Sequence, residues 1–195
     1  MQLWVGLGNP GGQYVLHRHN VGFMALDTLA EVYRFGPEGK KFQGLLREGR
    51  IGPDKVLLLK PQTFMNDSGR SVAAALNFYK LGAEALTVFH DELDLAPFKV
   101  KTKQGGGTAG HNGLRSIDQH MGPDPSTGLR GAIRRVRIGI GHPGHKDRVT
   151  GYVLGNYTKQ ELDPLADMLG ALAAEAVWLA KGDVVRFISD IASPQ

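Results

Sequence analysis

Short apolar runs that stop at glycine, proline or amide residues constrain the fold of this chain more than any other feature. Such runs are typical of buried β-strands, and segments with apolar residues at helical spacing lie between them. Strands that alternate with helices predict one α/β domain over residues 1–195, with a mixed, twisted β-sheet flanked by helices. Strands are expected at Gln2–Leu7, Lys55–Leu59, Leu86–His90, Phe98–Lys103 and Ala132–Ile140, and helices at Asn20–Phe35, Ser68–Tyr79, Gly113–His120, Leu162–Leu179 and Val184–Ile191.

The clearest helix signal lies near the C-terminus. Thr158 and Glu161 have the spacing of a capping box, in which the two side chains bind backbone N–H groups of the first helical turn. An apolar stripe follows at helical spacing up to Gly182, where the helix is expected to end. The segment Pro123–Gly128, rich in Pro, Ser, Thr and Asp, is expected to be the loosest loop.

Composition excludes several classes of protein. A chain of 195 residues with 42% hydrophobic content can bury one substantial core. Because the chain has no cysteine, disulfides, thiol catalysis and cysteine-bound zinc are excluded. No apolar run approaches the roughly 18 residues of a membrane span, and the N-terminus does not resemble a signal peptide. We therefore expect a cytoplasmic protein that does not contact a membrane.

The net charge of +4 is concentrated in one part of the chain. Residues 99–150 carry ten Lys and Arg against three Asp, whereas residues 1–98 are neutral and residues 151–195 are acidic. A positive field confined to one segment points to a polyanionic partner such as nucleic acid. A solvated basic face is the alternative, and composition does not decide between the two.

Polar clusters follow the predicted strands and hold most of the candidate chemistry. Open α/β sheets bind ligands at the ends of strands. One histidine, His19, is a candidate general base, and HDELD offers Asp91, Glu92 or Asp94 as a carboxylate to orient it. This set suits hydrolysis of an uncharged acyl group by an activated water molecule. The clusters are GLGNPG at 6–11 with RHN at 18–20, TFMNDSG at 63–69, HDELD at 90–94 and GGGTAGHNG at 105–113, and their amides are Asn9, Asn66 and Asn112.

His19 is expected just before the first long helix. The positive end of a helix dipole disfavours an imidazolium, which would help to keep His19 neutral and able to accept a proton near pH 7. A lone histidine is more often a capping or surface residue, so position alone does not make His19 catalytic. His17 is expected at the surface.

Other functions remain open from the residues alone. GLGNPG matches a dinucleotide-binding pattern, but helical periodicity begins only near Asn20 instead of on the glycines. A metal site built from HDELD and His17, His19, His142 or His145 lacks helical ligand spacing. A serine hydrolase would need a G-x-S-x-G turn, which Ser68 and Ser116 do not have. A binding module without turnover is the strongest rival to an enzyme.

The motifs, in this order, resemble the bacterial-type peptidyl-tRNA hydrolases. The resemblance runs through GLGNPG, RHNVG, KPQTFMNDSG, HDELDL, GGGTAGHNGLRSI and RIGIGHPG, and covers most of residues 1–157. It implies a monomeric esterase that frees tRNA from peptidyl-tRNA without a metal or cofactor. Thr108-Ala109 stands where family members often have His-Gly, so one polar contact is expected to be missing.

The resemblance also assigns roles to individual residues. It makes His19 the general base and chooses Asp91 as its orienting carboxylate. Asn9 and Asn112 are then the candidates to position the reacting carbonyl and to stabilise its oxyanion. The resemblance does not decide which amide faces the oxyanion. The residues implied to bind the peptide are Tyr14, Met65, Asn66, His111 and Asn112.

Three cations are implied to recognise the tRNA. Lys101 and Lys103 alternate along a predicted strand, so both project from one face, and Arg137 lies on a later strand. The resemblance makes these positions a clamp for the terminal 5′-phosphate of the tRNA. Ammonium groups and a guanidinium fork suit a phosphate dianion, although the same residues could merely solvate a strand face.

Overall fold

One seven-stranded mixed sheet organises the computed structural model, which describes residues 1–121 and 132–193. The strand order is β2-β3-β4-β1-β5-β7-β6. The four central strands run parallel, while β2, β3 and β6 pair antiparallel at the two edges. The predicted α/β class with a mixed sheet is therefore confirmed. The strands are β1 Gln2–Gly6, β2 Gly39–Lys41, β3 Gly44–Ile51, β4 Asp54–Pro61, β5 Leu86–Glu92, β6 Val100–Gln104 and β7 Arg134–Gly139.

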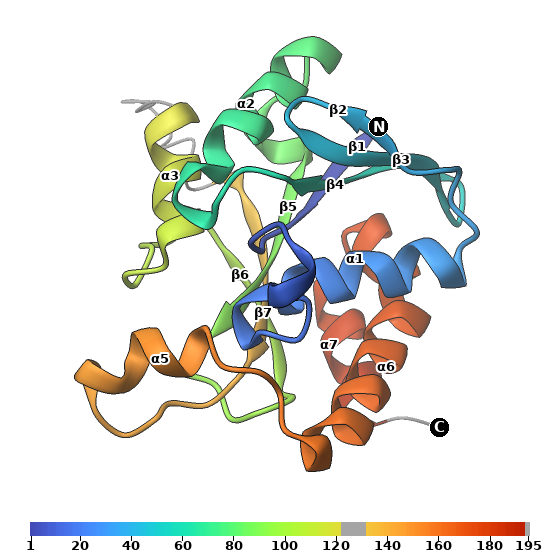
Figure 1. Cartoon of the computed structure of the whole chain (residues 1–195). Coiled ribbons are helices and arrows are strands. Elements are labelled where there is room, and N and C mark those ends of the chain that lie inside the picture. Colours follow the sequence, from blue (N-terminus) through green and yellow to red (C-terminus); the bar gives the residue numbers. More distant parts are fainter. Residues whose placement is uncertain (122–131, 194–195) are drawn as a thin grey trace.

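Helices cover both faces of the sheet. Figure 1 shows α2 and α3 on one side and α1, α6 and α7 on the other, with the short α5 at the edge of the sheet where β5 and β7 end. The described helices are α1 Val21–Val32, α2 Ser68–Tyr79, α3 Asn112–Met121, α5 Val149–Val153, α6 Leu162–Lys181 and α7 Val184–Ala192. None of the described helices is long and apolar enough to cross a membrane.

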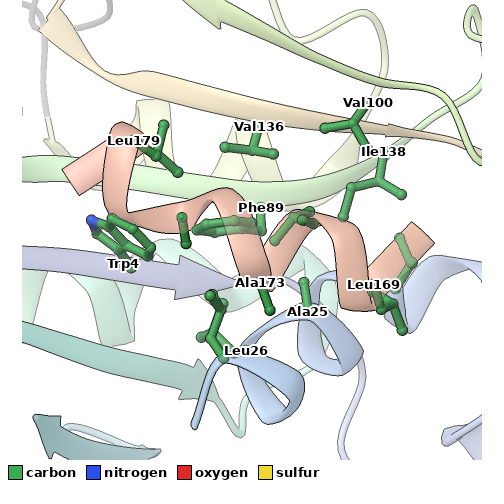
Figure 2. Close-up of a cluster of buried hydrophobic side chains, with 14 of the residues drawn as sticks. Trp4, Ala25, Leu26, Phe89, Val100, Val136, Ile138, Leu169, Ala173 and Leu179 are labelled. Atoms are coloured by element: carbon green, nitrogen blue, oxygen red, sulfur yellow. The ribbon is translucent and has the colours of Figure 1, made fainter. Parts of the chain in front are cut away.

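Strand alternation divides the core into two layers. In β1, Leu3 and Val5 pack in the cluster beneath α2 and α3, whereas Trp4 packs in the cluster beneath α1 and α6. Figure 2 shows this second layer, in which Trp4 and Phe89 lie between the sheet and the helices, with ring centroids 5.5 Å apart. Each fully buried large side chain of this kind stabilises the fold by about 1.5–3 kcal/mol.

Two glycines allow α1 to pack closely against the sheet. A Cβ on Gly22 would collide with the carbonyl oxygen of Phe89 and with the backbone of Leu7, and one on Gly6 would collide with the carbonyl of Gly22. The absence of these two side chains lets the start of α1 touch β1 and β5. This close approach brings His19, which lies in the 3-10 turn Arg18–Asn20 just before α1, to the end of β5.

Most predicted elements are present, with boundaries shifted by a few residues. The capping box at Thr158 and Glu161 is confirmed, and so are the apolar stripe of α6 and its end at Gly182, which has a φ of 84°. Strands β2 and β3 and helix α5 were not predicted. Strand β3 carries two glycines and two arginines in eight residues, and α5 is too short for helical periodicity. The predicted loop at Pro123–Gly128 lies outside the described residues.

Candidate active site

The polar clusters meet in one cavity at the carboxyl ends of β1 and β5. Strand β1 leads into the turn that carries Asn9, and β5 ends with Asp91 and Glu92. The cavity has a volume of about 580 Å³. Parallel strands end at the same edge of a sheet, which explains why clusters distant in sequence converge here. Among the lining residues are Asn9, His19, Phe64, Met65, Asn66, Asp91, His111, Asn112 and Arg135.

Asp91 lies at the centre of the site and binds two histidines. Its Oδ2 lies 2.8 Å from Nδ1 of His19, and its Oδ1 lies 2.7 Å from Nε2 of His111. The carboxylate is only 4% exposed. Burial alone would raise the pKa of Asp91, but the electrostatic attraction and the hydrogen bonds of His19 and His111 hold it well below its usual range. Asp91 is therefore an anion that accepts both hydrogen bonds.

The hydrogen-bond network assigns the tautomers of both histidines. Nδ1 of His111 accepts from the backbone N–H groups of Gly113 and Leu114, at 3.1 Å and 3.3 Å, so its proton is on Nε2 and is donated to Asp91. His19 donates its Nδ1–H to the other carboxylate oxygen. In neutral His19 the lone pair is then on Nε2, the atom that a base needs.

The pKa of His19 differs from the expectation based on the helix dipole. Burial lowers it, but the charge and hydrogen bond of Asp91 outweigh burial, so the pKa is raised above 6.5. The helix dipole does not decide the protonation of His19, because a carboxylate in direct contact has the larger effect.

Asn9 is held rigidly by its neighbours. Its side-chain oxygen accepts a hydrogen bond from the N–H of Met65 at 2.7 Å, so the NH₂ group is left to face the cavity. The side chain of Asn20 binds both the N–H and the carbonyl of Asn9, each at 2.9 Å. Asn20 was not recognised from the sequence, although its place beside His19 in RHN was a signal. Asn66 and Asn112 also line the cavity.

His90 and Arg135 form a second buried pair that the sequence did not reveal. His90 binds the carbonyl of Asp91 through Nδ1 at 2.8 Å and accepts from Nε of Arg135 at 3.2 Å. Burial, with smaller electrostatic contributions from His111 and the Arg135 cation, lowers the pKa of His90 to about 3, so this ring is neutral. No sequence pattern links these residues, because they lie on neighbouring strands far apart in the chain.

Tyr14 does not line the cavity. It lies in the 3-10 turn Gly12–Tyr14, and its ring packs edge-on against His17, with centroids 5.1 Å apart. Met65, Asn66, His111 and Asn112, the other residues expected to bind peptide, do line it. A peptide contact by Tyr14 stays a prediction.

The three cations expected to bind phosphate lie together. Lys101 of β6 pairs with Arg137 of β7, and Lys103 pairs with Arg135. Directly paired residues of an antiparallel ladder project from the same face. Both lysines are exposed, whereas Arg137 is partly buried and lies 3.5 Å from Glu92. The geometry brings the three cations to one face, and their role stays a prediction.

The distances within the site fit hydrogen bonds between the carboxylate and the two histidines better than they fit a bound metal ion. His19, Asp91 and His111 are the one group of potential ligands that converges among the described residues. The nitrogens of His19 and His111 lie 2.8 Å and 2.7 Å from the oxygens of Asp91, the length of charge-assisted hydrogen bonds. A metal bound about 2.0–2.2 Å from each ligand would have to push these groups apart.

The dinucleotide pattern in GLGNPG is not supported. Helix α1 begins only at Val21, so its N-terminus does not meet the glycine turn.

Comparison with known proteins agrees with this architecture. The family model for peptidyl-tRNA hydrolase matches residues 3–195. The peptidyl-tRNA hydrolase of Novosphingobium aromaticivorans is 73% identical, covering 100% of this chain and 98% of its own length. That of Sphingopyxis alaskensis is 69% identical, covering 98% of this chain and 97% of its own. A crystal structure of peptidyl-tRNA hydrolase from Acinetobacter baumannii superposes with a TM-score of 0.88 at 40% identity, covering 99% of this chain and 95% of that one.

The fold and the site thus define an α/β protein with a histidine–carboxylate centre at the carboxyl edge of its sheet. The chain belongs to the peptidyl-tRNA hydrolase family.

Proposed function

We propose that this enzyme hydrolyses the ester bond between a nascent peptide and the terminal ribose of tRNA by means of a water molecule that His19 activates. The observation that carries the proposal is the 2.8 Å contact between Nδ1 of His19 and Asp91. This contact orients the ring, leaves Nε2 as the basic atom and stabilises the imidazolium that forms when Nε2 takes a proton.

The reaction has two steps at the ester carbonyl. Water attacks the carbonyl carbon while His19 takes its proton, which produces a tetrahedral oxyanion. The oxyanion then collapses, the ester bond breaks, and His19 returns the proton to the ribose oxygen. An ester is reactive enough for this chemistry without a metal or cofactor, and none is part of the proposal.

Neutral amides are proposed to hold the substrate. The NH₂ group of Asn9 and the side chain of Asn112 are the candidates to donate to the carbonyl and its oxyanion. Asn66 and His111 are proposed to bind the peptide main chain beside Met65, with Tyr14 further out. Main-chain contacts suit an enzyme that must accept nascent peptides of many sequences.

The basic face of the β6–β7 strand pair is proposed to bind the tRNA. Lys101, Lys103 and Arg137 would contact the terminal 5′-phosphate, since two ammonium groups and a guanidinium match its charge. We further propose that the enzyme acts as a monomer in the cytoplasm.

Release of free tRNA from peptidyl-tRNA by the purified protein, with a chelator present, tests the activity. A binding module on the same fold would bind peptidyl-tRNA but leave the ester intact. Turnover that survives the chelator supports the proposed chemistry, whereas turnover that needs added metal contradicts it.

A further inference from the structure

We propose that Arg135 is a positioning residue for catalysis, which ties the glycine-rich loop to the end of β5, and is not a fourth cation for the tRNA phosphate. The inference rests on the proposed function, because it assigns Arg135 to the machinery around Asp91 and His19. Its position alone would suggest the opposite, since Arg135 pairs with Lys103 in the β6–β7 ladder and lies two residues before Arg137 on the same face.

Burial separates Arg135 from the neighbouring cations. Arg135 is 5% exposed, whereas Lys101 and Lys103 are exposed to solvent. Taking a guanidinium out of water is costly unless its N–H groups are satisfied. The hydrogen bonds of Arg135 must therefore compensate for the free energy lost by removing its guanidinium from water.

The guanidinium of Arg135 binds neutral acceptors in two different segments. Its Nε donates to Nε2 of His90 at 3.2 Å, and one terminal nitrogen donates to the carbonyls of Gly105 at 3.1 Å and Gly107 at 2.8 Å. None of these acceptors carries a charge. The fork of Arg135 thus connects β5 to the loop that follows β6.

On the β5 side the connection continues to Asp91. His90 is 1% exposed, and it donates its Nδ1–H to the carbonyl of Asp91 at 2.8 Å. Its Nε2 must then be the acceptor for Arg135. Two consecutive hydrogen bonds therefore join the guanidinium to the backbone of the residue that orients His19.

On the loop side the connection reaches His111. Gly105 and Gly106 have positive φ angles of 62° and 87°, a conformation that glycine adopts freely but does not hold by itself. The Lys103 side chain packs against Gly106. A few residues further on, Nε2 of His111 binds Oδ1 of Asp91 at 2.7 Å. Fixing the two glycine carbonyls therefore helps to fix His111 and Asn112 relative to Asp91.

A guanidinium is needed for this role, and a positive charge alone is not sufficient. A lysine at this position would keep the charge but could not donate to His90 and to two loop carbonyls with a planar fork. Arg135→Lys is thus the variant that tests geometry at constant charge, and Arg137→Ala is the matched control from the same face.

The experiment measures kcat and KM on peptidyl-tRNA with and without its 5′-phosphate. For Arg135→Lys and Arg135→Ala we expect kcat to fall at least about tenfold, while KM and the preference for the phosphorylated substrate stay within about threefold of the parent. For Arg137→Ala we expect the opposite result, in which KM rises, the phosphate preference is lost and kcat changes little. Hydrogen exchange of the amides of residues 105–113 should be faster in both Arg135 variants.

Two results would overturn the inference. One is a folded Arg135→Lys enzyme with parental kcat and parental loop exchange. The other is an Arg135 variant that loses the phosphate preference, which would make Arg135 a member of the clamp.

If neither Arg135 variant folds, His90→Gln is the alternative test, because it removes the ring that accepts from Nε of Arg135. This variant should show the same selective loss of kcat, and a parental kcat would overturn the inference. His19→Ala in the same assay separates the two proposals, since near-normal turnover in that variant contradicts the proposed function itself.

Discussion

The buried centre around Asp91 and the exposed cationic face of the β6–β7 strand pair differ in burial and in how their side chains are bonded. The centre is formed by Asp91, His19, His90 and His111. His19 and His111 each bind one carboxylate oxygen of Asp91, and His90 binds the backbone carbonyl of Asp91. On the cationic face, formed by Lys101, Lys103 and Arg137, the lysines are solvated.

The difference indicates how each region contributes to function. Hydrogen bonds to a buried charge hold the reacting groups at fixed distances and stabilise the transition state more than the bound substrate. Their loss should therefore lower kcat. Solvated cations are screened by salt and attract a polyanion over a longer range, so their loss should raise KM.

The largest effect is expected at His19. His19→Ala should lower kcat by about 10²–10⁴-fold, the usual contribution of a positioned general base, without loss of tRNA affinity. The measurement is kcat, with circular dichroism to check the fold. A near-normal kcat would remove His19 from the mechanism and with it the proposed role of the buried centre.

Asp91→Asn should have the next largest effect. A hydrogen bond to a charged group contributes about 1.5–3 kcal/mol, so the rate should fall about 10- to 150-fold. KM should change less than kcat. Asp94→Asn is the matched control, because Asp94 also lines the cavity but makes no contact with His19 that the structure records. If the control were the more damaging change, the choice of carboxylate within HDELD would be wrong.

A smaller effect, of a different kind, is expected on the cationic face. Lys103→Ala should raise KM far more than it lowers kcat. It should flatten the dependence of log affinity on log salt by roughly 0.7–0.9 per lost phosphate contact. The variant should also cease to distinguish phosphorylated from dephosphorylated substrate. An unchanged preference would exclude Lys103 from the clamp and would leave Lys101 and Arg137 to be tested in turn.

The elements of the fold were largely predictable, because their signals are local. Helix α2 has the bounds that its sequence predicts, and the capping box before α6 depends on two residues three positions apart. The strand order is not local information. Nothing in β3 itself indicates that it pairs with β4 through a tight turn at Gly52, whose φ is 61°.

The site was predictable in its members but not in its connections. His19, Asp91, Asn9, Asn66 and Asn112 were singled out, and the structure brings them to one cavity. The sequence could not show that His111 binds the second oxygen of Asp91, or that Arg135 binds His90. These contacts depend on the neighbouring positions of β5 and β7 and on the path of the glycine-rich loop.

The pH dependence of kcat/KM in the parent and in Asp91→Asn tests the central claim most directly. His19 must be neutral to accept a proton, so activity is lost as the pH falls through its pKa. The Asp91 carboxylate raises that pKa above the usual value of a histidine, so the acid limb of the parent should lie at a higher pH than an ordinary histidine would give. In Asp91→Asn the raising charge is gone while burial still lowers the pKa, so the limb should move to lower pH. The same midpoint in both enzymes would contradict the account, because it would mean that the Asp91 charge does not act on the group that takes the proton from water.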